Sequence, residues 1–319
     1  MIKVVIRPNE TFSKEEFLKD TEPYSIGLDG AVDSPTFRIV TERGPWANFD
    51  HHSGVDRLST RATSAQVHLE INMGLFKTFS DRGPKATVWI NDVDQDVCLA
   101  VWLLQNNERV INHADPIINR LVYTDEILDA TGGAYPFSVD AQIRRELDWI
   151  FEPYLMKRFS GSLRQATAFD LRTILEAVCY RITQYTLGRG EQIDLLGDSK
   201  IITTESYKDL KWSILVESGP KARMLSFIKN DAFIAHLSTR TVSLHGDKTR
   251  YDYTLARRSV WIPFPIPELY DHLNTIDVGL SEINKWGGSD IIGGSPRKIG
   301  SSFSPEVLKF EINKFLSTR

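Results

Sequence analysis

The chain has 319 residues, of which 41% are hydrophobic and 25% are charged, and its formal net charge at pH 7 is −4. This composition is typical of globular proteins with one large or two ordinary domains, and it excludes disordered and fibrous classes. No apolar run reaches the roughly 18 residues of a membrane span, so we expect no membrane partner. An acidic chain without a basic, aromatic-rich stripe also argues against binding to long nucleic acids.

Two features predict a cytoplasmic protein. Residues 1–7 resemble a first strand and lack the apolar core of a signal peptide. The two cysteines, Cys98 and Cys179, lie in apolar helical surroundings, so no disulfide framework is expected.

The charge is divided unevenly along the sequence, because the chain is acidic up to about residue 205 and basic after it. An acidic half beside a basic half suits a metal-holding domain and a domain for an anionic ligand.

The first informative segments are two predicted strands that end in polar residues. Residues 24–29 form one of them, ending at Asp29 in a turn rich in Gly and Pro. Residues 46–49 form the other and lead into Asp50, His51 and His52. An acid and an imidazole at the end of a strand suit Mn²⁺, Fe²⁺ or Zn²⁺. The alternatives are a polar turn for the histidines and turn capping for Asp29.

Residues 63–79 follow as a predicted helix, and a second acidic segment comes after it. Residues 86–90 predict a strand that breaks into Asp92, Asp94 and Asp96, and a helix resumes at Val97. Acids at a helix N-terminus are favoured by the helix dipole, which accounts for one or two of the three. Three carboxylates this close repel one another unless a cation compensates them, so we predict a metal site here.

The rest of the first domain offers one more imidazole. Residues 110–116 predict a strand end or tight turn that carries His113, which we include as a metal ligand. Asp125 and Asp129 lie one helical turn apart, so both could face one cavity. Two helices between residues 139 and 187 close this domain. We therefore expect an α/β fold with a mostly parallel open sheet in residues 1–190, a linker in 191–205 and a smaller α+β domain in 206–319.

The second domain ends in a segment with five glycines, residues 286–302. Its glycines allow a close backbone approach, and its N–H groups could bind an anion. Arg297 could add a bidentate contact to a phosphate. The alternative is a flexible surface loop. Residues 251–261 predict a strand carrying Arg257 and Arg258, one facing the site and the other solvent. The predicted substrate-binding set is Gly293, Gly294, Ser295, Arg297 and Arg258.

These motifs together resemble the DHH phosphoesterase superfamily, in the form with a C-terminal DHHA1-type domain. Asp29, the run Asp50-His51-His52 and the run Ala62-Thr63-Ser64-Ala65 follow that family's order and spacing. Asp94-Gln95-Asp96 resembles the family's opening motif, although it follows the Asp-His-His run and lacks that motif's histidine. It is either a permuted counterpart of that motif or a variant of the family's last acidic motif. The terminal segment is similar to the glycine-rich DHHA1 loop, with Ser295 where a histidine is usual.

The resemblance implies hydrolysis of a small phosphorylated or nucleotide substrate in an interdomain cleft, with Mn²⁺ or a similar ion (Mg²⁺, Fe²⁺ or Zn²⁺) activating water. One or two ions would bind, and the predicted ligands are Asp29, Asp50, His51, Asp92, Asp94, Asp96 and His113. Asp50 and His52 are the predicted catalytic residues, His52 by orienting a ligand or contacting the leaving oxygen. A non-catalytic nucleotide or phosphate sensor on the same scaffold is the alternative function, and a homodimer stays open beside a monomer.

Overall fold

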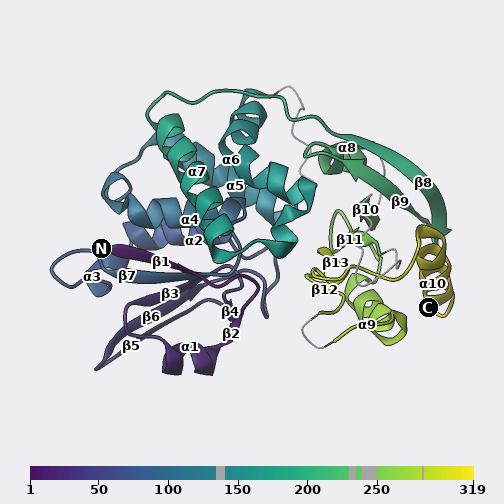
Figure 1. Cartoon of the computed structure of the whole chain (residues 1–319), viewed down its shortest axis with the longest axis horizontal. Coiled ribbons are helices and arrows are strands. Elements are labelled where there is room, and N and C mark those ends of the chain that lie inside the picture. Colours follow the sequence, from purple (N-terminus) through teal and green to yellow (C-terminus); the bar gives the residue numbers. More distant parts are fainter. Residues whose placement is uncertain (134–140, 230–234, 239–249, 282–283) are drawn as a thin grey trace. The chain divides into compact units, whose positions relative to one another are not determined.

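The computed structural model describes residues 1–133, 141–229, 235–238, 250–281 and 284–319. The chain divides into two compact units, each described here by itself (Figure 1). Unit 1 comprises Met1–Ala130 and Asp140–Asp194, and unit 2 comprises Thr131–Val139 and Leu195–Arg319. In the described ranges, no helix has the length and apolar character needed to cross a membrane.

Unit 1 is built on a five-stranded sheet with the order β1-β7-β3-β6-β5. The strands are β1 (Ile2–Ile6), β3 (Ser25–Leu28), β5 (Phe37–Thr41), β6 (Gly44–Phe49) and β7 (Ala86–Ile90). The pairs β1·β7, β7·β3 and β3·β6 are parallel, and β5 joins β6 antiparallel. The expectation of an α/β fold with a mostly parallel sheet is therefore confirmed for this unit. A separate two-stranded sheet pairs β2 (Phe12–Ser13) with β4 (Val32–Asp33).

The helices of unit 1 lie mainly on one side of the sheet. Figure 1 shows α2, α4, α5, α6 and α7 there and α1 on the other side. Phe17 of α1 packs with Val32, Phe37 and Trp46 beneath the sheet. The helices are α1 (Lys14–Asp20), α2 (Thr63–Asn72), α3 (Leu75–Thr78), α4 (Gln95–Gln105), α5 (Pro116–Ala130), α6 (Gln142–Ser160) and α7 (Ala168–Thr186), with 3₁₀ turns η1 (Asn107–Arg109) and η2 (Ser162–Gln165).

Residues 63–79 form two helices rather than the one expected. Helix α2 ends at Asn72, and α3 begins after Gly74, whose φ is 106°. That backbone conformation is left-handed, so it cannot continue a right-handed helix, and glycine adopts it without the steric cost of a Cβ.

Unit 2 contains a six-stranded mixed sheet with the order β12-β13-β11-β10-β9-β8. Its strands are β8 (Asp198–Tyr207), β9 (Leu210–Ser218), β10 (Ala235–Ser238), β11 (Asp252–Ala256), β12 (Gly287–Gly288) and β13 (Ile292–Gly294). Its helices are α8 (Ala222–Lys229), α9 (Ile266–Ile276) and α10 (Pro305–Ser317). Trp212, Phe264 and Trp286 are fully buried in its core.

The predicted linker, residues 191–205, is only partly a connection. Strand β8 begins at Asp198 and pairs antiparallel with β9 from Asp198 opposite Ser218 to Tyr207 opposite Leu210, with one register shift between Ile201 and Thr203. The hairpin turns at Lys208, whose φ is 51°. The polar composition of this segment suggested a linker, but a strand at the edge of a sheet is polar as well because solvent reaches it.

Candidate metal centre

The parallel strands of unit 1 deliver two of the predicted residues to one edge of the sheet. Leu28, the last residue of β3, lies opposite Phe49, the last residue of β6. Asp29 and Asp50 therefore follow at neighbouring positions, and the Asp29 N–H donates to the Phe49 carbonyl oxygen at 3.0 Å. Open parallel sheets hold their functional residues at this edge, beyond the carboxyl ends of the strands.

Five side chains converge there, and we call Asp29, His51, His52, Asp96 and Asp129 the Asp–His cluster. His51 Nε2 lies 2.9 Å from Asp129 Oδ2, 3.3 Å from Asp29 Oδ1 and 3.8 Å from Asp96 Oδ2. His52 Nε2 lies 3.1 Å from the same Asp29 oxygen. The cluster contains two triads, Asp29–His51–His52 and His51–Asp96–Asp129. Within each triad the three possible ligand atoms lie within 4.8 Å of one another.

The His51 ring is the strongest indication that this cluster suits a cation. Its side chain is 0% exposed, and within the described residues neither ring nitrogen has a hydrogen-bond partner in acceptable geometry. Three carboxylate oxygens nevertheless lie within 3.8 Å of Nε2. Buried polar atoms are nearly always satisfied, so an unsatisfied imidazole among carboxylates fits a bound divalent ion.

The electrostatics of the cluster reflect this crowding of charge. Burial alone would lower the pKa of His51, but the carboxylates of Asp129 and Asp29 outweigh burial and raise it to about 11. Burial raises the pKa of Asp96 to about 6, with the negative charges of Asp129 and Asp29 adding to the effect. Burial opposes ionisation of Asp29 too, yet His52 and His51 hold the pKa of that carboxyl well below its ordinary value.

Helix α2 supports the cluster through its N-terminus. The backbone N–H groups of Thr63 and Ser64 both donate to the Asp96 carboxylate at 2.7 Å, one to each oxygen. The Thr63 hydroxyl donates to Asp29 Oδ1 at 3.0 Å. Ser64 Oγ donates to Asp125, which is buried beside the cluster. These contacts fix the carboxylates from behind, as outer hydrogen bonds do around metal ligands.

Asp50, the predicted ligand and catalytic group, does not join either triad. Its Oδ1 accepts the Gly30 N–H, and its Oδ2 accepts the N–H groups of His52 and Ser53, all at 2.8 Å. The carboxylate therefore holds the turn that aims the two histidines. The tight turn after β6 exposes backbone donors on its inside, and Asp50 is the nearest acceptor for them.

Two of the three acids after β7 also accept hydrogen bonds from backbone N–H groups close to them in sequence. Asp94 caps α4 by accepting the Val97 N–H at 3.0 Å, and Asp92 accepts the N–H of Val93 at 2.7 Å. Neither belongs to a triad, so of these three acids only Asp96 enters the cluster. Burial raises the pKa of Asp94 well above its ordinary value, with Asp29 and Asp92 contributing.

His113 lies outside the cluster as well. It is exposed in the turn between η1 and α5, and its N–H donates to the Val110 carbonyl oxygen at 3.2 Å. Residues 110–112 form no strand, so this segment does not end at the edge of the sheet. Asp115 caps α5, accepting the Ile117 N–H at 2.9 Å.

Two residues of the site were not among the predicted ligands. Asp129 was noted only for its spacing from Asp125, and the last turn of α5 places it against His51. Arg57 carried no sequence signal at all. Its guanidinium contacts Asp129 and His52, and its side chain is 7% exposed. The positive charge of Arg57 and the interaction with His51 lower the pKa of Asp129 despite burial.

The glycine-rich segment of unit 2 has a packing role. A Cβ on Gly293 would lie 2.2 Å from Tyr270 Oη, and one on Gly294 would lie 2.4 Å from the Tyr253 carbonyl oxygen. Both glycines lie in β13 between two partner strands, and Ser295 exchanges hydrogen bonds with the Tyr253 backbone. This local structure is a sheet rather than an open anion-binding loop.

The predicted arginines differ in environment. Arg297 and Arg258 are exposed, whereas Arg257 donates to the backbone carbonyl oxygens of Asp290, Ile262 and Phe264. A surface depression of about 520 Å³ in unit 2 includes Arg257 in its lining, but none of the five predicted substrate-binding residues. Their contact with a substrate stays a prediction.

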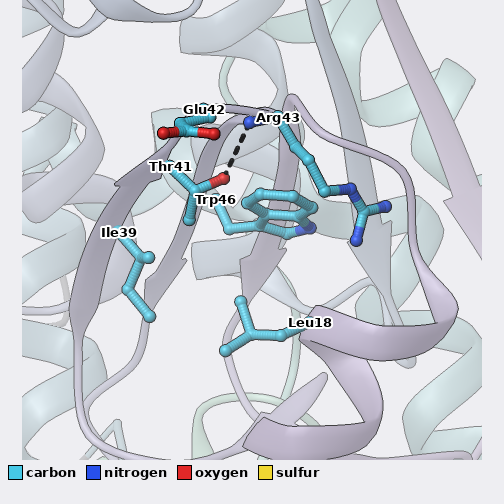
Figure 2. A pocket seen from close by; sticks show the side chains of 6 residues that line it. All are labelled: Leu18, Ile39, Thr41, Glu42, Arg43 and Trp46. Carbon is cyan, nitrogen blue, oxygen red and sulfur yellow. Dashed lines mark hydrogen bonds between the residues drawn. The ribbon is translucent and has the colours of Figure 1, made fainter.

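A second depression, of about 410 Å³, lies in unit 1 (Figure 2). It is lined by Leu18, Ile39, Thr41, Glu42, Arg43 and Trp46. Trp46 lies near the start of β6, whereas His51 follows that strand's end, so this depression is separate from the Asp–His cluster.

Searches against models of protein families, curated proteins and solved structures found no match for this chain.

Proposed function

We propose that unit 1 binds one or two divalent metal ions, with Mn²⁺ as the first choice, and that the protein is a phosphoesterase acting on a small phosphorylated or nucleotide substrate. The observation that carries the proposal is the buried His51 ring, surrounded by three carboxylates and lacking a well-directed hydrogen bond. We also propose a relationship to the DHH superfamily, supported by Asp29 and the Asp50-His51-His52 run.

The chain's own groups would divide the work. Asp29, His51, Asp96 and Asp129 would hold the ion, and the N-terminus of α2 would orient Asp29 and Asp96. A divalent ion held there supplies Lewis-acid chemistry, which activates water at neutral pH and offsets the charge that builds on phosphorus. The His52 side chain is 39% exposed, so it is the imidazole of the cluster that a substrate can reach.

The test combines metal analysis of the purified protein with Mn²⁺-dependent hydrolysis of a generic phosphodiester and a phosphomonoester. We expect bound metal and hydrolysis of at least one substrate. His51→Gln should remove both, and the control His113→Ala should change neither, because His113 is exposed and outside the cluster. A protein that binds no Mn²⁺, or whose hydrolysis survives His51→Gln, contradicts the proposal.

A nucleotide or phosphate sensor is the second candidate. One observation favours it. The Arg57 guanidinium, together with a His51 ring whose raised pKa keeps it protonated, offsets the negative charge of the cluster's carboxylates without a metal ion. A nucleotide that raises the melting temperature without Mn²⁺ and without turnover would support the sensor and count against the enzyme.

A further inference from the structure

Arg57 is a buried arginine whose guanidinium contacts the Asp–His cluster. It lies in the loop between β6 and α2, and its Nη2 donates to the Asp129 backbone carbonyl oxygen at 2.9 Å and to both carboxylate oxygens at 3.1 Å. Its Nη1 lies 2.7 Å from Nδ1 of His52. One guanidinium thus connects Asp129, at the end of α5, to His52 in the loop after β6.

The contact with His52 determines where that ring carries its proton. A guanidinium has only donors, so Nδ1 of His52 must accept the hydrogen bond through its lone pair. A ring with an unprotonated Nδ1 is neutral and carries its proton on Nε2. That Nε2 atom lies 3.1 Å from Asp29 Oδ1, a carboxylate oxygen that accepts hydrogen bonds.

We propose that Arg57 is a positioning residue that holds His52 as the neutral Nε2–H tautomer and so keeps its Nε2 from binding the metal. The inference deepens the proposed function, on which it rests. In this arrangement the ion binds His51 as its only imidazole ligand, together with Asp29, Asp96 and Asp129. His52 then donates a hydrogen bond to Asp29 instead of binding the ion.

The same guanidinium also fixes a metal ligand. Asp129 Oδ2 is shared by Arg57 and His51, which lie 3.1 Å and 2.9 Å away. Because Arg57 binds both the backbone and the side chain of Asp129, it limits how that carboxylate can rotate. Loss of Arg57 therefore frees two groups at once: the His52 ring can take its other tautomer, and the Asp129 carboxylate can turn.

The first experiment reads the tautomer in the metal-free protein. Two-bond proton–nitrogen NMR correlations of protein labelled at histidine nitrogens distinguish a protonated ring nitrogen from an unprotonated one. We expect His52 with Nε2 protonated and Nδ1 unprotonated in the wild type, and a mixture of tautomers in Arg57→Met. Arg61→Met is the matched control, because Arg61 lies in the same loop and also contacts α5, through Glu126, but is 55% exposed.

The second experiment is a double-mutant cycle on Mn²⁺ affinity. In the wild-type background, His52→Gln should change the Kd for Mn²⁺ by less than about threefold, because His52 is not a ligand and the glutamine amide can still donate a hydrogen bond to Asp29. In the Arg57→Met background the freed Nε2 can bind the ion, so His52→Gln should weaken binding by about tenfold or more. Arg61→Met should behave as the wild type.

The outcomes separate this inference from the proposed function. A wild-type His52 protonated on Nδ1, or on both nitrogens, overturns the role of Arg57, and this measurement needs no variant to fold. An equal effect of His52→Gln in both backgrounds overturns it as well. If His52 shows the predicted tautomer and the protein binds Mn²⁺ but hydrolyses neither substrate, the positioning role of Arg57 stands. The proposed phosphoesterase activity is then refuted.

Discussion

Binding of Mn²⁺ to the Asp–His cluster should release protons, because the ion replaces the positive charge that the metal-free protein holds on His51. The carboxylates of Asp129 and Asp29 raise the pKa of His51 to about 11, although burial opposes this. Between pH 7 and 9 the ring is therefore protonated, and it must lose that proton to become a ligand.

The magnitude follows from this pKa. One proton released per ion makes the apparent affinity for Mn²⁺ rise tenfold per pH unit, about 1.4 kcal/mol per unit, over the range from pH 7 to 9. Asp96, whose pKa is raised to about 6 by burial and its acidic neighbours, should add a second proton below that pH. The slope should therefore steepen toward twice its value in acid.

Isothermal titration calorimetry in two buffers of different ionisation enthalpy measures the number of protons released. We expect about one proton per ion at pH 7.5 in the wild type, and no measurable Mn²⁺ binding, and so no linked proton release, in His51→Gln. Tight binding of Mn²⁺ with no proton release between pH 7 and 9 would refute the reasoning, because His51 would then be neutral in the metal-free fold.

Two further predictions concern stability. Asp50→Ala should lower the free energy of unfolding by about 2–4 kcal/mol, because three backbone N–H groups lose their acceptor in a buried turn, and urea denaturation measures the change. An unchanged urea midpoint would show that the turn holds without this carboxylate. Gly293→Ala should cost about 1–3 kcal/mol, since its Cβ would overlap Tyr270 Oη and the Gly287 carbonyl oxygen. Mn²⁺ affinity should not change with it, and a loss of metal binding would contradict the packing role.

The strand ends could be predicted from the sequence because they depend on local pattern. Apolar residues followed by an acid or histidine marked the ends of β3 and β6, and parallel strands place such ends at one edge. Asp29 and His51 therefore meet as expected. The same reasoning could not tell which carboxylate oxygens accept hydrogen bonds from the backbone. Asp50, Asp92 and Asp94 lie within hydrogen-bond distance of N–H groups that only the folded turns provide.

Tertiary packing decided the rest. Asp129 reaches His51 because α5 packs against α2 and α4, a contact between segments far apart in the sequence. Arg57 belongs to the site for the same reason: it joins a loop to the end of α5, and isolated arginines carry no pattern. By itself, the sequence determined the mostly parallel sheet and the residues at its edge. The side chains that complete the cluster depended on which helices cover that edge, because charges pair by distance in space rather than by separation along the chain.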